Sequence, residues 1–194
     1  MSDLWSEIRT RFEESYARAR ARETVESTAM LLATAGADGR PSSRTVLLKS
    51  FDRRGFVFYT NRRSRKARHL AENPHAALTF FWPSIMEQVH VEGRVEPVTD
   101  GEADAYWRTR PRESQIGAWA SDQSAELSSR EELLERVRAA SERFSGDVPR
   151  PPHWSGYRLT PDRIEFWVSR EHRLHDRFLY ERGEGGWTMH RLFP

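Results

Sequence analysis

The sequence contains no cysteine and no long apolar run. Without cysteine there is no disulfide, no thiolate nucleophile and no zinc–thiolate site, and the redox compartment stays undetermined. Any redox chemistry must therefore come from a cofactor. Residues 1–24 are charged throughout, and no segment approaches the ~20 apolar residues that span a bilayer. We therefore expect no membrane partner and, by default, a cytoplasmic protein.

Glycine-rich loops are also missing, because the 11 glycines are scattered through turns. A doubly wound nucleotide-binding sheet needs a glycine-rich first turn and strands that alternate with crossover helices. Neither pattern is present, which excludes that fold. Phosphate binding must then rely on side chains and isolated backbone amides.

Net charge is low: 31 basic and 29 acidic side chains leave a formal charge of +2. The basic side chains are mostly arginine, and the pI of about 9.2 is compatible with phosphorylated ligands. This balance is too weak to indicate nucleic acid as a partner. A length of 194 residues fits one domain.

The pattern of apolar residues predicts a mainly β protein with helices (α+β). Leu4, Ile8 and Phe12 recur at helical spacing, which predicts a helix from Asp3 to about Arg22. After Thr28, short apolar runs alternate with turn residues and predict strands over 29–35, 44–49, 56–60, 76–82, 88–98, 156–159, 163–168, 178–182 and 187–192. We expect the first three strands to form a meander. The predicted architecture is one domain over 1–194, with an N-terminal helix in 1–24 and an antiparallel barrel with decorating helices in 25–194.

Four helices are predicted between the strands, one of them beginning near Arg112 after Pro111. Ser64 can cap a short helix that ends at Asn73, before a proline. Capping-box patterns open two more helices, one at Thr99 with Glu102 and one at Ser128 with Glu131.

Cations and hydroxyls gather at two places in the first strands. Arg44 and Lys49 bracket one strand, and their odd separation points them to opposite faces if the strand is regular, so that they could serve different phosphates. Two solvated charges at strand ends are an equally good interpretation. Hydroxyls and cations also meet at a strand end and a helix N-terminus, where an anion is favoured. These residues are Tyr59, Thr60, Asn61, Ser64, Arg65 and Lys66.

Tyr106, Arg110 and Ser114 are spaced by four and offer a guanidinium and two hydroxyls to an anion. Proline is tolerated only in the first turn of a helix, so Pro111 should begin a new helix and place Arg110 at a break between two helices. The break could aim the three groups at one ligand. A surface helix pair with a hinge is slightly favoured by the sequence alone.

The segment Glu171–Arg177 alternates so that Arg173, His175 and Arg177 would project from one face of an extended chain. Two cations around an imidazole repel each other unless an anion or an electron-rich ring lies between them, which favours a ligand site. His172 would face away, and no other cluster has metal-ligand spacing, so no metal is expected. Among the tryptophans, which are mostly core or interface material, only Trp167 is close enough in sequence to stack on a flat cofactor.

Taken together, these residues resemble the pyridoxamine (pyridoxine) 5′-phosphate oxidase family. The matching stretches are RTVLLK at 44–49, FYTN at 58–61, SRK at 64–66, RPRESQIGAW at 110–119, QS at 123–124 and EHRLHDRF at 171–178. The resemblance runs from about Thr28 to Pro194, and several long motifs occur in the same order. It implies an FMN-binding split β-barrel that forms a homodimer, with two FMN sites at the subunit interface, each built from both chains.

The resemblance also assigns site residues. Lys49, Tyr106, Arg110 and Ser114 match the residues that bind the substrate phosphate, and Arg173 and His175 match the catalytic pair over the pyridine ring. Glu87 and His90, beside Gln88, depart from the family pattern and change the local charge. The positions matching FMN-binding residues are Arg44, Val46, Leu47, Tyr59, Thr60, Arg65, Lys66, Gln88, Gln123, Ser124, Trp167 and Arg177.

The activity implied by the resemblance is oxidation of pyridoxine or pyridoxamine 5′-phosphate to pyridoxal 5′-phosphate. Dioxygen is the implied acceptor and hydrogen peroxide the second product. One alternative is a related flavin oxidase of a secondary pathway such as phenazine biosynthesis, but Tyr106, Arg110 and Ser114 would then have no phosphate to bind. The other is a non-catalytic protein that binds flavin or pyridoxal phosphate, against which the presence of Arg173 and His175 argues.

Overall fold

A computed structural model describes residues 4–194, so Asp3, the expected first residue of the N-terminal helix, lies outside the described residues. The helices of this part are α1 (Leu4–Arg22), α2 (Arg65–Glu72), α3 (Asp100–Thr109), α4 (Arg112–Ala120), α5 (Arg130–Arg143) and the short 3₁₀ helix η1 (Glu171–Arg173). The strands are β1 (Ala29–Ala35), β2 (Pro41–Leu47), β3 (Ser50–Asp52), β4 (Gly55–Asn61), β5 (His75–Trp82), β6 (Glu87–Pro97), β7 (Trp154–Val168), β8 (Asp176–Gly183) and β9 (Gly186–Leu192).

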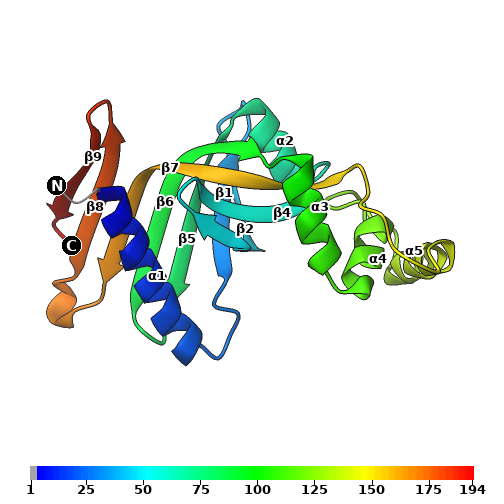
Figure 1. Cartoon of the computed structure of the whole chain (residues 1–194), viewed down its shortest axis with the longest axis horizontal. Helices are drawn as coiled ribbons and strands as arrows, with labels where there is room; N and C mark the ends of the chain where they lie inside the picture. The colour runs from blue at the N-terminus through cyan, green and yellow to red at the C-terminus, as the bar shows by residue number, and fades with distance from the viewer. Residues whose placement is uncertain (1–3) are drawn as a thin grey trace.

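The strands form one curled, antiparallel, nine-stranded sheet, as expected for a split barrel (Figure 1). Its order is β2-β1-β5-β6-β7-β4-β3, and β8 pairs with β7 and with β9. The predicted meander of the first three strands is wrong. β1 and β2 form a hairpin, but β4 pairs with β7 instead of β2. Pairing of strands far apart in sequence is decided by which faces become buried together, which local sequence does not encode.

Two strand boundaries also differ from the prediction. The separate strands expected at 156–159 and 163–168 are one continuous strand, β7, whose pairing with β6 shifts register between Glu92 and Gly93. At such an irregularity one strand has an extra residue without a partner on the other strand, here the β7 residue that follows Pro161. The strand expected at 44–49 ends at Leu47, so Lys49 lies beyond it.

Helix α1 packs against the curled sheet and contributes to the main core. Its buried Ile8, Phe12 and Ala19 belong to the same cluster as the inward-facing side chains of the strands. The Phe12 ring lies 5.1 Å from the Phe56 ring and 5.3 Å from the Phe80 ring. Burying a phenylalanine stabilises a fold by about 1.5–3 kcal/mol, so these contacts hold the helix on the sheet.

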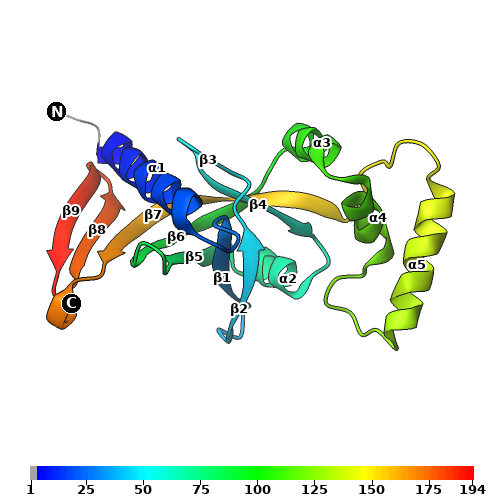
Figure 2. The same cartoon turned by 90° about the horizontal axis from the view of Figure 1, so that it is seen from below.

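Helices α3, α4 and α5 extend from one end of the sheet, whereas β8 and β9 lie at the opposite end (Figures 1 and 2). The predicted capping box of Thr99 and Glu102 is present at the start of α3. The cap of α5 is Ser129, which accepts from the Glu132 amide, so the predicted pair begins one residue too early.

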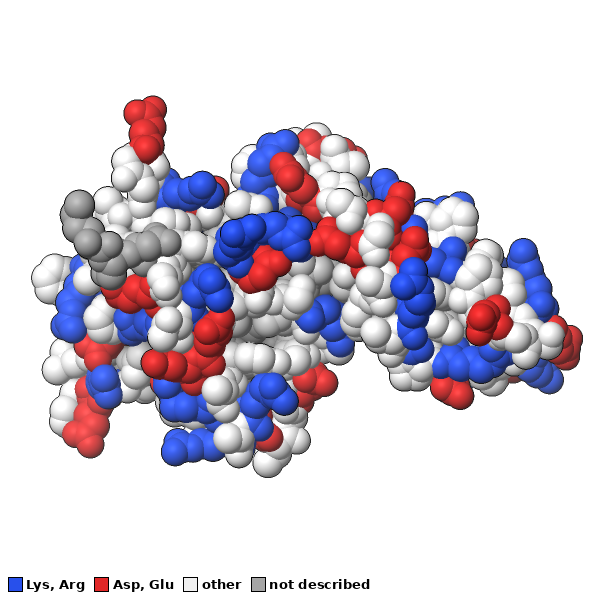
Figure 3. All heavy atoms as spheres, in the orientation of Figure 1, with Lys and Arg blue, Asp and Glu red and all other residues white. Residues whose placement is uncertain are grey.

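Within residues 4–194, no helix is long and apolar enough to cross a membrane. Basic and acidic side chains are interspersed over the face drawn in Figure 3. Ion pairs link several of them, as where Arg158 bridges Asp52 on β3 and Glu102 on α3. This bridge ties α3 to the edge of the sheet that carries β4.

Candidate functional site

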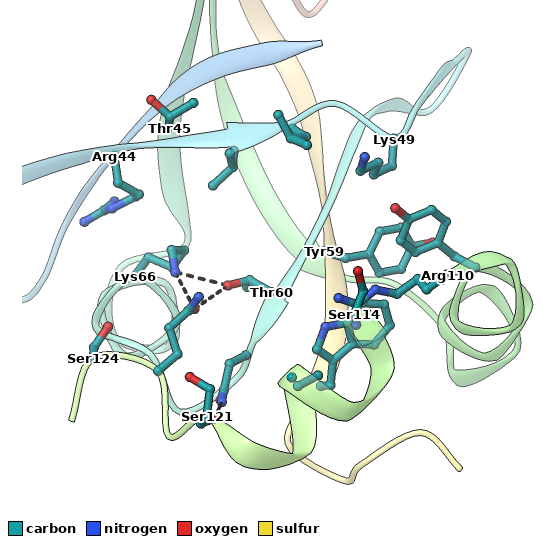
Figure 4. A pocket seen from close by; sticks show the side chains of 18 of the residues that line it. Arg44, Thr45, Lys49, Tyr59, Thr60, Lys66, Arg110, Ser114, Ser121 and Ser124 are labelled. Atoms are coloured by element: carbon teal, nitrogen blue, oxygen red, sulfur yellow. Dashed lines mark hydrogen bonds between the residues drawn. The ribbon is translucent and has the colours of Figure 1, made fainter. Parts of the chain in front are cut away.

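A cavity of about 960 Å³ opens between β2, β4, α2 and the α3–α4 junction. Its volume is at the upper end of the range for small-molecule and cofactor sites. The side chains that line it approach from separate elements and point into one space (Figure 4). The predicted site residues on its wall are Arg44, Val46, Leu47, Lys49, Tyr59, Thr60, Arg65, Lys66, Tyr106, Arg110, Ser114, Gln123 and Ser124.

The cavity is strongly cationic. Both lysines of the chain, Lys49 and Lys66, line it together with three arginines. Within residues 4–194, no aspartate or glutamate is among the lining residues. Cations brought together without a carboxylate repel one another until an anion neutralises them, so this arrangement favours a ligand with more than one negative charge.

At one end of the cavity, Lys66 is buried with only 7% of the residue exposed. Its Nζ donates to Gln123 Oε1 at 2.8 Å and to the hydroxyls of Thr60 at 3.1 Å and Ser64 at 3.2 Å. Burial and, secondarily, the positive charge of Arg44 lower the pKa of Lys66 to about 8. Ser64 begins α2 as predicted, but its side chain accepts from Lys66 and does not cap the helix.

Arg44 reaches the same end of the cavity from β2. Its Nη1 donates to Thr34 Oγ1 at 2.7 Å and its Nη2 to Ser42 Oγ at 2.8 Å, which fixes the guanidinium. Burial lowers the pKa of Arg44, and the neighbouring charge of Arg65 adds to this effect. The site therefore holds its cations in place before any ligand binds, at an electrostatic cost that a bound anion would remove.

Lys49 and Arg110 lie at the other end of the cavity (Figure 4). The prediction that Arg44 and Lys49 face opposite sides of a regular strand fails, because β2 ends between them and both line the same cavity. At this end, the Tyr59 ring stacks on the Tyr106 ring, with 4.1 Å between the ring centroids, and on the Trp154 ring at 5.2 Å. The stack forms a wall from which polar groups project.

The helix break expected at Pro111 is present, and Arg110 is the residue that caps the C-terminus of α3. The guanidinium of Arg110 lies 4.8 Å from the Trp154 ring centroid and 5.1 Å from that of Trp107. Its Nη1 is buried without a hydrogen-bond partner, and burial lowers the pKa of Arg110. A buried, unpaired guanidinium N–H is costly, so this atom is a place where an acceptor from a ligand fits.

The remaining predicted residues lie elsewhere in the chain. Gln88, Trp167 and Arg177 occupy one row across β6, β7 and β8, because Gln88 pairs with Trp167 and Trp167 pairs with Arg177. Arg173 and His175 are in the turn that joins β7 to β8. This row and turn lie at the end of the molecule away from α3 and α4 in both views (Figures 1 and 2). One chain therefore presents the predicted site residues as two separate groups.

The turn does not have the extended conformation predicted for 171–177. Glu171–Arg173 form a 3₁₀ helix, and His172 and Arg173 have positive φ angles of 56° and 62°. The alternation of side chains that the sequence suggested therefore does not apply before Asp176. Trp167 does lie beside this turn, with its ring 4.5 Å from the His175 ring. No group of three His, Asp or Glu side chains in residues 4–194 is arranged to hold a metal ion.

Trp154 is a lining residue that the sequence analysis missed. It lies at the start of β7, opposite Asn61, and so is delivered to the cavity by a pairing between strands that are far apart in sequence. No local signal distinguished it from the tryptophans of the core.

Comparison with known proteins places these features in a family. The model of the pyridoxamine 5′-phosphate oxidase family matches residues 17–168, and that of the pyridoxine 5′-phosphate oxidase C-terminal dimerisation region matches residues 154–194. A pyridoxine/pyridoxamine 5′-phosphate oxidase of Myxococcus xanthus is 58% identical over 185 residues, covering 95% of this chain and 90% of the relative. One of Alkalilimnicola ehrlichii is 58% identical over 194 residues, covering 98% and 99%.

Solved structures agree on the fold. PhzG from Burkholderia lata 383, in complex with tetrahydrophenazine-1-carboxylic acid, has a TM-score of 0.90 and 35% identity, covering 100% of this chain and 94% of that chain. An FMN-binding, pyridoxamine 5′-phosphate oxidase-related protein from Nostoc punctiforme has a TM-score of 0.78 at 21% identity over 96% of each chain, a likeness of fold alone. The family models, the close relatives and the shared fold agree, and the chain belongs to the pyridoxamine 5′-phosphate oxidase family.

Proposed function

We propose that this protein is an FMN-dependent oxidase that converts pyridoxine 5′-phosphate or pyridoxamine 5′-phosphate to pyridoxal 5′-phosphate, with dioxygen as the acceptor and hydrogen peroxide as the second product. The observation that carries the proposal is the cavity with five cations, no lining carboxylate within residues 4–194, and cations at both of its ends. Two phosphates, one from the cofactor and one from the substrate, match that arrangement.

The residues present fit FMN at the end of the cavity near α2. Arg44, Arg65 and Lys66 supply positive charge, and Ser124 lies close by with a hydroxyl. Lysine and arginine side chains at the N-terminal end of a helix are well suited to a phosphate dianion. Val46 and Leu47 of β2 continue the wall toward the other end and would lie along a flat ring system.

The substrate phosphate would bind at the other end. Lys49 and Arg110 supply charge there, Tyr106 and Ser114 supply hydroxyls, and the unpaired Nη1 of Arg110 has an acceptor in this arrangement. Fixing the phosphate sets the distance of the pyridine ring from the flavin, so these residues act by orientation.

The proposal includes a homodimer in which each chain, as a single domain, contributes to both sites. Gln88, Trp167, Arg173, His175 and Arg177 do not line the cavity of their own chain, and the turn between β7 and β8 lies at the end of the molecule away from α3 and α4 (Figures 1 and 2). In a two-fold symmetric dimer the same surface of a second copy can supply them, and two equivalent sites result. The match of residues 154–194 to a dimerisation region supports this assembly.

When bound, FMN would accept a hydride equivalent from C4′ of the substrate and return the electrons to dioxygen, giving hydrogen peroxide. The alcohol substrate also loses its hydroxyl proton, whereas the amine substrate gives an imine that water hydrolyses to the aldehyde and ammonia. The chain's own residues bind and orient. Arg173 of the second copy would press the pyridine ring toward the flavin, and His175 would hold the phenolic oxygen. The cations near the ring system would stabilise negative charge that develops during the reaction.

The test is to mix the FMN-loaded protein anaerobically with pyridoxine 5′-phosphate and to follow the flavin absorbance. We expect bleaching that reverses when air is admitted, with pyridoxal 5′-phosphate formed. Pyridoxamine 5′-phosphate is tested in the same way. An unchanged flavin spectrum with both substrates would contradict the proposal.

The likeness to PhzG favours one second candidate, an oxidase of a larger aromatic carboxylic acid. Its substrate would have no phosphate for Arg110 and Ser114. Reduction of the flavin by a reduced phenazine carboxylic acid, without reduction by either pyridine phosphate, would favour this candidate.

A further inference from the structure

The turn between β7 and β8 is held at two points by one residue, Arg170. Its backbone N–H donates to His175 Nδ1 at 3.1 Å. Its side-chain Nε donates to Asp176 Oδ2 at 2.7 Å, in an ion pair. Arg170 thus contacts two consecutive residues on the far side of the turn and closes it into a loop.

The residues enclosed by these contacts have an unfavourable backbone. His172 and Arg173 both have a left-handed conformation, with φ of 56° and 62°. For residues other than glycine this costs roughly 1–2 kcal/mol each, so it persists only where surrounding contacts impose it. The contacts of Arg170 lie on both sides of the two strained residues, as does the hydrogen bond from the Leu174 amide to the Glu171 carbonyl at 3.1 Å.

The backbone contact has a chemical consequence for His175. Because Nδ1 accepts the Arg170 N–H, the neutral imidazole carries its hydrogen on Nε2. The Trp167 ring lies 4.5 Å from the imidazole at an interplanar angle of 49° and restricts its rotation. The ring is therefore held with a defined donor, Nε2–H, on the edge opposite the turn.

The ion pair between Arg170 and Asp176 acts on the geometry of the turn and adds little to the stability of the whole protein. Arg170 is 58% exposed and Asp176 is 28% exposed in this ion pair. The hydrogen bond from Arg170, and next the charges of Arg170, Arg191 and Arg11, lower the pKa of Asp176, so the carboxylate is ionised at neutral pH. An exposed ion pair adds little to the free energy of unfolding, but it can fix the geometry of a short loop.

We propose that Arg170 is a positioning residue, which holds His175 in the Nε2–H form and Arg173 in its strained conformation so that both can meet the ligand of the second copy. The proposal rests on the proposed function, in which these two side chains contact the substrate. It goes beyond that function by assigning a role to a residue outside the matched motifs.

The test compares Arg170→Ala and Arg170→Lys with the parent, all as FMN-loaded protein. Arg182→Ala is the matched control, because Arg182 is an exposed arginine on the adjoining strand β8. KM and kcat for pyridoxine 5′-phosphate, FMN affinity and Tm are measured for each. Independently of activity, the nitrogen shifts of His175 are recorded by ¹⁵N NMR at a pH where the imidazole is neutral, and His175→Gln identifies the signal.

We expect Arg170→Ala to raise KM roughly tenfold, the scale of a small displacement of a substrate-contacting group, with FMN affinity and Tm close to those of the parent. Alanine keeps the backbone N–H at position 170, but without the ion pair to Asp176 the turn is no longer held closed over that contact. The His175 signal therefore changes from a single Nε2–H form to a mixture of tautomers. Arg170→Lys, which keeps an ion pair with Asp176, should have a KM and a His175 signal close to those of the parent. Arg182→Ala should show neither change.

An unchanged His175 tautomer in Arg170→Ala would overturn the proposal. So would a KM of Arg170→Ala equal to that of the parent, provided that the parent oxidises pyridoxine 5′-phosphate. A fall in Tm that accounts for the loss of activity, with the tautomer intact, would also overturn it, since Arg170 would then be only structural. If the parent itself does not oxidise the substrate, the proposed function fails, and the NMR comparison still decides whether Arg170 sets the His175 tautomer.

Discussion

Lys66 Nζ lies 2.8 Å from Gln123 Oε1, which joins the start of α2 to the segment after α4 across the floor of the cavity. The ammonium group is buried and lies near Arg44, and its pKa is lowered to about 8. A bound phosphate would stabilise the charged form and raise this pKa again. Proton binding at Lys66 should therefore be coupled to ligand binding.

We expect FMN affinity to fall as pH rises above about 8. Below that pH, Lys66 is charged with or without ligand, so binding takes up no proton there. Above it, the free protein has lost a proton that the complex regains, and affinity decreases. Isothermal titration calorimetry in two buffers of different ionisation enthalpy measures the uptake directly. Lys66→Met should bind FMN more weakly and lose this part of the pH dependence, and equal proton uptake by parent and variant would contradict the assignment.

Arg110→Ala should raise KM for pyridoxine 5′-phosphate by about 10- to 100-fold, the effect expected for losing a charged hydrogen bond worth ~1.5–3 kcal/mol. FMN should stay bound, because Arg110 lies at the other end of the cavity (Figure 4). Steady-state kinetics and flavin content measure the two effects.

Two comparisons make this test specific. Arg108→Ala, an exposed arginine of the same helix, should behave as the parent. Unphosphorylated pyridoxine, tested at high concentration, should be oxidised about equally poorly by the parent and by Arg110→Ala. If Arg110→Ala lowered the activity by the same factor with the phosphorylated and the unphosphorylated substrate, Arg110 would not bind the phosphate.

Co-expression of Arg110→Ala with Arg173→Ala, each with its own tag, should restore activity at low substrate concentration, where each variant alone is nearly inactive. If each site takes Arg110 from one chain and Arg173 from the other, a mixed dimer has one intact site and one doubly defective site. The purified mixed dimer should therefore have about half of the parent's activity per flavin, and the unseparated mixture from random pairing about a quarter. Activity per flavin in the purified mixed dimer measures this. No gain over the separate variants would place the two residues in one site of a single chain.

Gly93→Ala should lower the free energy of unfolding by about 1–3 kcal/mol or more, the range for overpacking. A Cβ at Gly93 would lie 2.1 Å from the Thr160 carbonyl oxygen, at the point where the pairing of β6 with β7 changes register. That oxygen belongs to the backbone, so the strands must separate to make room. Urea unfolding measures the change.

Gly101→Ala is the control for this substitution, because a Cβ there meets nothing within 4 Å and alanine favours the α3 helix. It should leave the stability unchanged or slightly raise it. Equal stability of the two alanine variants would show that the β6–β7 contact has more room than the structure indicates.

Features that depend on neighbouring residues could be predicted from the sequence alone. The Thr99–Glu102 capping box and the helix break at Pro111 are local, because a cap or a proline acts within one turn of chain. The missing cysteines and glycine-rich loops excluded whole classes of chemistry. Family motifs named the residues around the cavity, and 13 of the 18 residues so identified line it.

Contacts between segments far apart in the sequence could be read only from the folded structure. The pairing of β4 with β7 brings Trp154 beside Tyr59, and the end of β2 turns Lys49 into the same cavity as Arg44. The strained conformation of His172 and Arg173 is imposed by contacts of Arg170 that their own sequence does not indicate. Strand pairing and imposed backbone strain depend on burial and hydrogen bonds across long sequence separations, so local propensity could not have supplied them.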